Sequence, residues 1–273
     1  MTKTISIRHV LAASLLAFTA LPAPPVFAQA TAAKPFEPTV GQAGKDVVWV
    51  PTPQALVEKM LDMARITPQD LHYDLGSGDG RTVITAAKRG ARSMGIEYNP
   101  DMVALAQKNA AAAGVTARAT IVQADLFETD FSKANVVTLF LLPAINMKLR
   151  PKILDMKPGT RIVANTFTME DWTPDQTETI SGDCVSWCTA LLWVVPAKVA
   201  GTWQVGPNTL TLTQNFQNLT GTFGGAAISD AKLHGDEISF TAGGAKYTGK
   251  VDGNAMKGSM TGGAGDTFTA TRK

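Results

Sequence analysis

Between residues 50 and 196, apolar positions occur alternately at helical spacing and in short continuous runs. The apolar residues between Leu56 and Ala64 recur at the spacing of one helix face, which predicts a helix that begins at Thr52–Pro53, with Thr52 as its N-cap. Further helices are expected at 81–88, at 102–113 behind a cap at 99–101, and at about 146–154.

Short apolar runs between these helices predict strands at 71–74, 91–97, 117–124, 135–142 and 160–165. Strands that alternate with helical crossovers form a parallel sheet covered on both faces. The runs at 177–182 and 189–195 have no helix of crossover length between them, so they are interpreted as an antiparallel hairpin that closes a seven-stranded sheet. The predicted fold class is α/β and Rossmann-like.

From about residue 199 the pattern changes to short alternating runs rich in threonine, separated by glycine turns. This pattern predicts an antiparallel meander of seven or eight strands that closes into a small all-β barrel or sandwich. It contains no catalytic constellation, so a binding or stabilising role is expected. The predicted boundaries are 47–197 for the α/β domain and 198–273 for the β-meander domain.

The first 28 residues have the composition of an export signal. Lys3 and Arg8 precede an apolar run, and small residues end at Ala28, which predicts a cleaved signal peptide at 1–28 and a periplasmic or secreted protein. The alternative is an uncleaved membrane anchor. Residues 29–46 are interpreted as a flexible lead-in. Cleavage leaves 23 basic and 23 acidic side chains, so the net charge gives no support for a nucleic-acid partner.

The main chemical motif is the loop that follows the predicted strand at 71–74, with the sequence Asp74-Leu75-Gly76-Ser77-Gly78-Asp79-Gly80. Glycines permit a sharp turn and close approach of a ligand to the backbone. The spacing differs from the G-x-G-x-x-G dinucleotide fingerprint. Two carboxylates would repel a pyrophosphate but would attract an ammonium or sulfonium group, which favours S-adenosylmethionine over NAD.

These residues resemble the motifs of class I S-adenosylmethionine-dependent methyltransferases. The resemblance covers about residues 48 to 196. In the wording of its motifs the chain is similar to the bacterial relatives of the ATP synthase c-subunit lysine methyltransferase. The segments that carry it are Val50–Pro53, Tyr73–Arg81, Gly95–Glu97, Gln123–Asp125, Leu141–Pro143 and Pro158–Arg161.

The resemblance implies S-adenosyl-L-methionine as cofactor. Glu97 is expected to accept hydrogen bonds from the ribose hydroxyls, Asp125 to hold the adenine amine beside Leu126, and Asp74 to hold the methionine ammonium. The expected cofactor-binding residues are therefore Asp74, Gly76, Ser77, Gly78, Gly80, Glu97, Asp125 and Leu126. The catalytic base is not identified from the sequence.

The resemblance to this subfamily implies a protein lysine as methyl acceptor. The apolar 141–146 loop of the chain is compatible with a membrane-associated protein partner as well as with core packing. Because that loop lacks the Asn/Asp-Pro-Pro-aromatic pattern, a nucleic-acid base is a poor candidate. No acidic metal cluster is evident. Two alternatives remain, namely a methyltransferase for a small-molecule acceptor and an exported binding protein that retains the fold without catalysis.

Two further observations concern histidine and cysteine. His72 lies within a predicted strand and is interpreted as a core residue rather than a catalyst. Cys184 and Cys188 form a disulfide if a turn separates them, and otherwise they are free buried cysteines.

Overall fold

The computed structural model describes residues 1–4, 36–182, 184–263 and 265–273. The predicted signal peptide, apart from its first four residues, and residues 29–35 of the predicted lead-in lie outside the described residues. None of the helices in these described ranges has the length and apolarity needed to span a bilayer.

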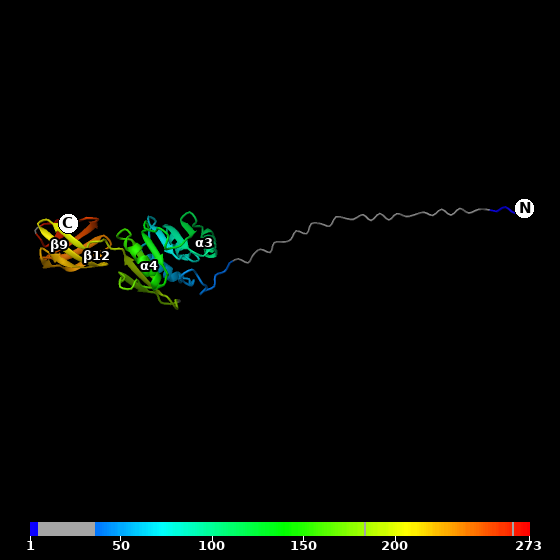
Figure 1. The fold of residues 1–273 in the computed structure, drawn as a ribbon, viewed down its shortest axis with the longest axis horizontal. Coiled ribbons are helices and arrows are strands. Elements are labelled where there is room, and N and C mark those ends of the chain that lie inside the picture. Colours follow the sequence, from blue (N-terminus) through cyan, green and yellow to red (C-terminus); the bar gives the residue numbers. More distant parts are fainter. Residues whose placement is uncertain (5–35, 183, 264) are drawn as a thin grey trace. The chain divides into compact units, whose positions relative to one another are not determined.

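The α/β part begins at residue 36 and is coloured blue to green in Figure 1. Its helices are α1 (Gln54–Met63), α2 (Arg81–Lys88), α3 (Pro100–Ala112) and α4 (Pro143–Leu154). Its strands are β1 (Leu71–Leu75), β2 (Arg92–Glu97), β3 (Ala119–Gln123), β4 (Val136–Leu139), β5 (Arg161–Asn165), β6 (Gln176–Thr179) and β7 (Thr189–Val194).

These strands form one seven-stranded sheet in the order β3-β2-β1-β4-β5-β7-β6. Strands β1 to β5 pair in parallel, whereas β7 is antiparallel to both β5 and β6. The predicted closing hairpin is therefore confirmed. The strand order reverses between β1 and β4, and in such sheets ligands bind at the carboxyl ends of the strands beside this reversal.

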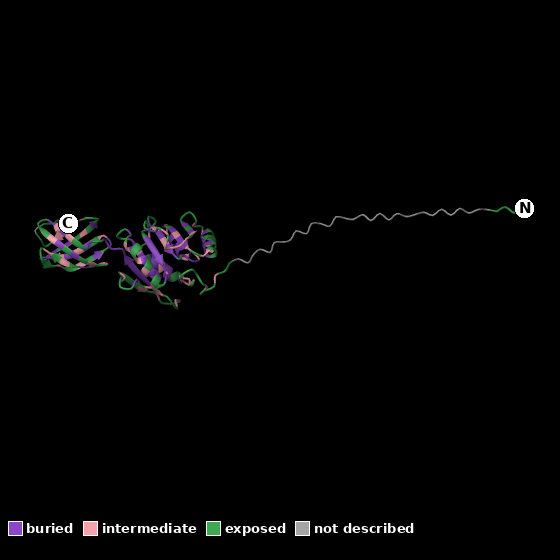
Figure 2. Cartoon of the chain, viewed as in Figure 1, coloured by how far each residue is buried: buried purple, intermediate pink, exposed green. Residues whose placement is uncertain are grey.

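Helices cover both faces of the sheet. The apolar residues of α1 pack with alternate residues of β4, β5 and β7, and those of α2 and α3 pack on β3. Helix α4 packs with the other set of alternate residues, on the opposite face. Figure 2 shows the resulting buried residues along the central strands. Burial on both faces explains why these strands are continuous apolar runs in the sequence.

Several predicted element ends need correction. Helix α1 begins one residue later than predicted, its N-cap is Pro53, and no side chain caps it. The Thr52 hydroxyl instead accepts a hydrogen bond from Asn165 Nδ2 at 3.3 Å. Strand β4 ends at Leu139 rather than 142, and Pro143 starts α4, because proline fits the first turn of a helix. The predicted cap is confirmed at Asn99, whose side chain accepts from the backbone of Asp101 and Met102.

The β-meander is a closed barrel, which settles the open choice between barrel and sandwich (yellow to red in Figure 1). Its nine strands exceed the predicted seven or eight because the two-residue β11 is attached to β10 outside the ring. The ring closes through the pairing of β9 with β10. The strands are β8 (Gly201–Val205), β9 (Asn208–Asn215), β10 (Asn218–Phe223), β11 (Ala226–Ala227), β12 (Ser229–His234), β13 (Glu237–Ala242), β14 (Ala245–Asp252), β15 (Ala255–Thr261) and β16 (Thr267–Arg272).

The barrel strands alternate buried and exposed residues, as Figure 2 shows, and the buried set forms one apolar core around Trp203 and Phe240. One barrel turn also contacts the α/β part. The ring of Phe216 stacks on Trp172 with centroids 5.7 Å apart, and Gln217 Oε1 accepts from Trp172 Nε1 at 3.0 Å. Trp172 is fully buried. The barrel turn therefore completes part of the core of the first domain.

Candidate active site

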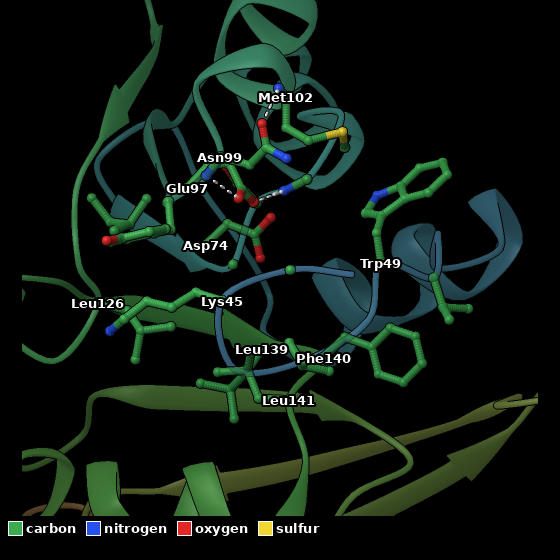
Figure 3. A pocket seen from close by; sticks show the side chains of 18 of the residues that line it. Lys45, Trp49, Asp74, Glu97, Asn99, Met102, Leu126, Leu139, Phe140 and Leu141 are labelled. Atoms are coloured by element: carbon green, nitrogen blue, oxygen red, sulfur yellow. Dashed lines mark hydrogen bonds between the residues drawn. The ribbon is translucent and has the colours of Figure 1, made fainter. Parts of the chain in front are cut away.

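A pocket lies at the carboxyl ends of β1, β2 and β4, next to the reversal in strand order. It encloses about 1050 Å³ of empty space, counting the part open to solvent, and Figure 3 shows the side chains around it. The pocket is lined by most of the residues that the sequence nominated, namely Asp74, Gly76, Ser77, Gly78, Glu97, Asp125 and Leu126.

The glycines of the β1–α2 loop are required by its backbone and by its neighbours. Gly76 and Gly78 have φ values of +80° and +53°, in the left-handed region that favours glycine. A Cβ atom on Gly78 would lie 2.7 Å from Trp49 Nε1. Only glycine therefore lets the indole of Trp49 pack on this loop.

Gly80 has a different role from the other two glycines, since it does not line the pocket. It is the N-cap of α2 with φ of +81°, and a Cβ atom there would lie 3.0 Å from the Cβ of Ala106. Gly80 thus allows close packing of α2 against α3, and its contact with the cofactor stays a prediction.

Both carboxylate oxygens of Glu97 are held by backbone amides. Oε2 accepts from Gly78 N and Oε1 accepts from Asn99 N, each at 2.9 Å, and both bonds are drawn in Figure 3. The two bonds fix the carboxylate at the end of β2 and connect it to the glycine loop. Each oxygen retains a lone pair that can accept from a ligand hydroxyl.

Asp74 is the end of a buried chain of hydrogen bonds across three strands. Thr138 Oγ1 donates to Asp74 Oδ1 at 2.6 Å and lies 2.8 Å from His72 Nε2, while His72 Nδ1 lies 2.6 Å from Ser93 Oγ. Because the Thr138 proton goes to Asp74, Thr138 accepts from His72 Nε2–H, and His72 Nδ1 then accepts from Ser93. His72 is therefore the core residue that was predicted.

Burial acts in opposite ways on these two groups. Desolvation lowers the pKa of His72 from 6.5 to about 3, so its ring is neutral at physiological pH. Desolvation raises the pKa of Asp74 from 3.8 to about 7, and the negative charges of Asp79 and Glu97 add to the rise, against the Thr138 hydrogen bond. Asp74 is consequently an acid whose ionised form would be stabilised by a bound cation.

Asp125 and Leu126 line the pocket beyond the end of β3, but Asp125 already has two partners. Lys45 Nζ donates to its Oδ2 at 2.6 Å and the Phe127 amide donates to its Oδ1 at 2.8 Å. The hydrogen bond from Lys45 lowers the pKa of Asp125 and raises that of Lys45. The ammonium of Lys45 also lies 5.0 Å from the centroid of the Tyr98 ring.

The segment that carries Lys45 was missed by the sequence interpretation. Residues 42–46 were assigned to a flexible lead-in on their composition, yet they line the pocket. The Gly41 amide donates to Trp49 O and the Trp49 amide donates to Gln42 O, both at 2.9 Å. Residues 41–49 thus form a hydrogen-bonded strap at the pocket, and Trp49 within it was the available signal.

The side of the pocket formed by residues 139–145 is apolar and contains Leu139, Phe140, Leu141 and Ile145. Phe140 and Leu141 are labelled in Figure 3. Near it, Cys184 and Cys188 form a disulfide in the β6–β7 loop, which settles the choice left open by the sequence. Among the described residues, no three His, Cys, Asp or Glu side chains are grouped to hold a metal ion.

The residues present fit S-adenosylmethionine in their chemistry. Glu97 offers a fixed acceptor for two hydroxyls, and Asp74 offers a buried carboxylate for an ammonium. Ser77 Oγ is buried and has no hydrogen-bond partner among the described residues, so it is free to bond a ligand. Leu126 and Met102 supply apolar surface for a base.

Comparisons with known proteins agree with this fit. The family model described as the ANTKMT methyltransferase domain matches residues 74–176. A protein-lysine N-methyltransferase of Saccharolobus islandicus is 44% identical over 133 residues, which are 48% of this chain and 83% of that protein. The ATP synthase c-subunit lysine N-methyltransferase of Mus musculus is 37% identical over 130 residues, 47% of this chain and 52% of that protein.

A solved structure also resembles the α/β part. It is an RNA methyltransferase from Salinibacter ruber in complex with S-adenosyl-L-homocysteine, 47% identical, with a TM-score of 0.51, covering 55% of this chain and 96% of that chain. The archaeal relative is matched over most of its length, whereas the chain spans about half the length of the mouse relative. The chain therefore belongs to the class I S-adenosylmethionine-dependent methyltransferases, in the family of the protein-lysine N-methyltransferases related to the ATP synthase c-subunit enzyme.

Proposed function

We propose that the protein transfers a methyl group from S-adenosylmethionine to the ε-amine of a lysine in a protein. The observation that supports it most is the pocket in which Asp74, Glu97 and the glycine loop meet, in a chain 44% identical to a protein-lysine N-methyltransferase. Because the carboxylates of Asp74, Glu97 and Asp125 are all present and held by hydrogen bonds, an exported protein that keeps only the fold is the weaker alternative.

In this proposal each polar residue positions one part of the cofactor. Glu97 accepts from the ribose hydroxyls, and Asp74 in its ionised form pairs with the ammonium of the amino-acid part. Asp125 and Leu126 hold the adenine, with Asp125 accepting from its amine through the lone pairs that Lys45 and Phe127 leave unused. The buried Ser77 hydroxyl, which has no hydrogen-bond partner among the described residues, forms a hydrogen bond with the bound cofactor.

Methyl transfer requires alignment of the amine with the methyl group and exclusion of water more than strong acid–base catalysis. When bound, S-adenosylmethionine would supply a methyl group on a cationic sulfur. The lone pair of the lysine nitrogen would form the new bond to carbon as the carbon–sulfur bond breaks towards sulfur, and the methylated amine would lose its proton to water. The apolar wall at Phe140 and Leu141 keeps water away and favours the neutral amine, since burial lowers the pKa of lysine.

Export is a further part of the proposal. The predicted signal peptide at residues 1–28 would place the mature chain in the periplasm or outside the cell, with a membrane-associated protein as the partner. Its support is the sequence pattern together with the disulfide between Cys184 and Cys188, because disulfides persist in oxidising compartments. Retention of the uncleaved segment as an anchor is the alternative that fractionation would detect.

The experiment is transfer of labelled methyl from S-adenosylmethionine to cell-envelope protein of the source organism, prepared from cells lacking this gene. Label recovered as methyl-lysine after protein hydrolysis, and lost with Asp74→Ala, is the expected result. RNA is the competing acceptor, because the Salinibacter ruber structure is described as an RNA methyltransferase. Label that is sensitive to ribonuclease, or that remains in small molecules, would refute the lysine proposal.

A further inference from the structure

Three aromatic side chains from three different loops meet beside the side of the pocket formed by residues 139–145. Phe140 follows β4, Phe167 follows β5, and Trp187 precedes β7. The Phe140 ring lies 5.8 Å from that of Phe167 and 6.0 Å from that of Trp187, between centroids. We call these three residues the aromatic wall.

The sheet topology explains why these loops meet. β7 runs antiparallel to β5, so the residues before β7 lie at the carboxyl end of β5, where the Thr166 amide donates to Thr189 O at 2.7 Å. β4 is the parallel neighbour of β5 on the other side. Phe140 also lines the cofactor pocket, so the aromatic wall continues directly from it.

The backbone at Trp187 is strained although its side chain is not in the core. Its φ is +55°, in the left-handed region that is unfavourable for a residue with a side chain. Its side chain is 42% exposed, and the neighbouring Val185 is 95% exposed. Strained residues of this kind occur where the surroundings hold them and often lie at functional sites. Here the disulfide between Cys184 and Cys188 encloses Trp187 and constrains its backbone.

The aromatic wall is suited to a long side chain with a terminal amine. The wall and its chain neighbours at 139–142 and 166–168 contain no acidic or basic residue. An ammonium group that arrives there meets aromatic rings, whose faces attract cations. The methylene groups of a lysine would at the same time cover apolar surface.

We infer that Trp187, held in place by the Cys184–Cys188 disulfide, is a substrate-binding residue that receives the acceptor lysine together with Phe140 and Phe167. This inference rests on the proposed function, because it assigns the lysine of that reaction to a place on the protein. The disulfide acts by positioning Trp187. Reduction of the disulfide releases the loop and weakens binding of the acceptor without changing the cofactor site.

Five proteins are compared with the wild type, of which the fifth combines the tryptophan-to-alanine change with the double serine change. Trp187→Ala removes the ring and Trp187→Phe keeps an aromatic face. Val185→Ala is the matched control, because Val185 lies in the same loop and is more exposed than Trp187. The fourth protein has both Cys184→Ser and Cys188→Ser. Each is titrated with S-adenosyl-L-homocysteine by calorimetry and assayed for methyl-lysine formation over a range of cell-envelope protein concentrations.

The expected result is weaker binding of the acceptor protein with unchanged affinity for the cofactor product. Trp187→Ala raises the envelope-protein concentration needed for half-maximal rate at least tenfold and leaves S-adenosyl-L-homocysteine affinity within twofold, while Trp187→Phe and Val185→Ala stay close to wild type. The double serine variant shows a similar rise. Combining it with Trp187→Ala adds little more, because groups that act through one another are not additive.

Three results would overturn the inference. In the first, Trp187→Ala needs the same envelope-protein concentration for half-maximal rate as the wild type. In the second, Trp187→Ala also loses affinity for S-adenosyl-L-homocysteine. In the third, the effects of the tryptophan and cysteine changes are fully additive. Absence of methyl-lysine with the wild type itself, while S-adenosyl-L-homocysteine binds, refutes the proposed function and the inference with it. The two failures are therefore distinguishable.

Discussion

Asp74→Asn is expected to make the cofactor-free protein more stable at pH 8 and to weaken its affinity for the cofactor. The asparagine keeps the shape of the side chain and can still accept from Thr138 Oγ1. It removes the ionisable group, which is 7% exposed and faces the neighbouring acids Asp79 and Glu97. Function and stability therefore make opposite demands on this position.

The magnitude follows from the raised pKa of Asp74. A rise from 3.8 in the unfolded chain to about 7 in the folded protein spans roughly three pH units, and at 1.36 kcal/mol per unit the ionised carboxylate costs about 4 kcal/mol. Because the folded pKa is the higher one, the contribution of Asp74 to stability is fully present below pH 3.8 and is lost as the pH rises through about 7. The variant should gain its advantage over the same interval.

Calorimetric melting of the cofactor-free protein at pH 5 and pH 8 measures this difference. The transition of the α/β domain is the one that S-adenosyl-L-homocysteine shifts in the wild type. At pH 8 the variant should melt higher by on the order of 10 °C, and at pH 5 by much less. Asp252→Asn, an exposed acid of the barrel, is the matched control and should change neither transition by more than a degree or two.

Titration with S-adenosyl-L-homocysteine gives the second half of the prediction. Loss of a charged partner for the ligand ammonium should weaken binding by about 1.5–3 kcal/mol, a factor of about ten to a hundred. A variant that melts no higher than wild type at pH 8 would show that burial does not penalise the Asp74 carboxylate. Unchanged affinity would show that Asp74 does not meet the ammonium.

Four further outcomes are expected. Glu97→Ala should weaken binding of S-adenosyl-L-homocysteine by about 1.5–3 kcal/mol in calorimetry, and Glu97→Gln by less, because two ligand hydroxyls lose a charged acceptor; equal affinity in all three proteins would contradict this. A chain that ends at Pro196 should still bind S-adenosyl-L-homocysteine, because the pocket residues all precede it, but should melt lower since Trp172 loses its cover; loss of binding in a chain that is folded by circular dichroism would refute it. In denaturant titrations, His72→Gln should gain stability relative to wild type as the pH falls from 6.5 towards 3. The lowered pKa of His72 means that its contribution to the stability of the wild type is present above pH 6.5 and is lost as the pH falls below it. A constant difference in stability between the two proteins across that interval would argue against a neutral buried ring. N-terminal sequencing of the exported protein should begin at Gln29, and an intact N-terminus in the membrane fraction would indicate an anchor.

Features that depend on near neighbours in the chain were predictable from the sequence. The α/β alternation follows from periodicities that span a few residues, as does the closing hairpin at β6 and β7. The glycine loop is recognisable because a turn with positive φ at Gly76 and Gly78 needs glycine at fixed spacing. Glu97 was found because a carboxylate at the end of a parallel strand lies at the ligand-binding edge of the sheet.

Features that depend on long-range contacts were missed or left open. Residues 41–46 of the strap look like a linker in composition. Only the packing of the strap at the pocket brings Lys45 to Asp125 and Trp49 to Gly78. Pro143 was also misinterpreted. It ends an apolar run in the sequence, but in the fold β4 stops at Leu139 and Pro143 starts α4.

By itself, then, the sequence determined the order of strands and helices, the class of cofactor and the edge of the sheet where the site lies, because each of these is encoded in local spacing. Only the tertiary structure decided that His72 and Thr138 connect to Asp74, that the barrel closes, and that Phe140, Phe167 and Trp187 meet. Those contacts join residues from separate strands and loops. Their formation depends on how the sheet is paired and packed, which no local pattern of apolar and polar residues specifies.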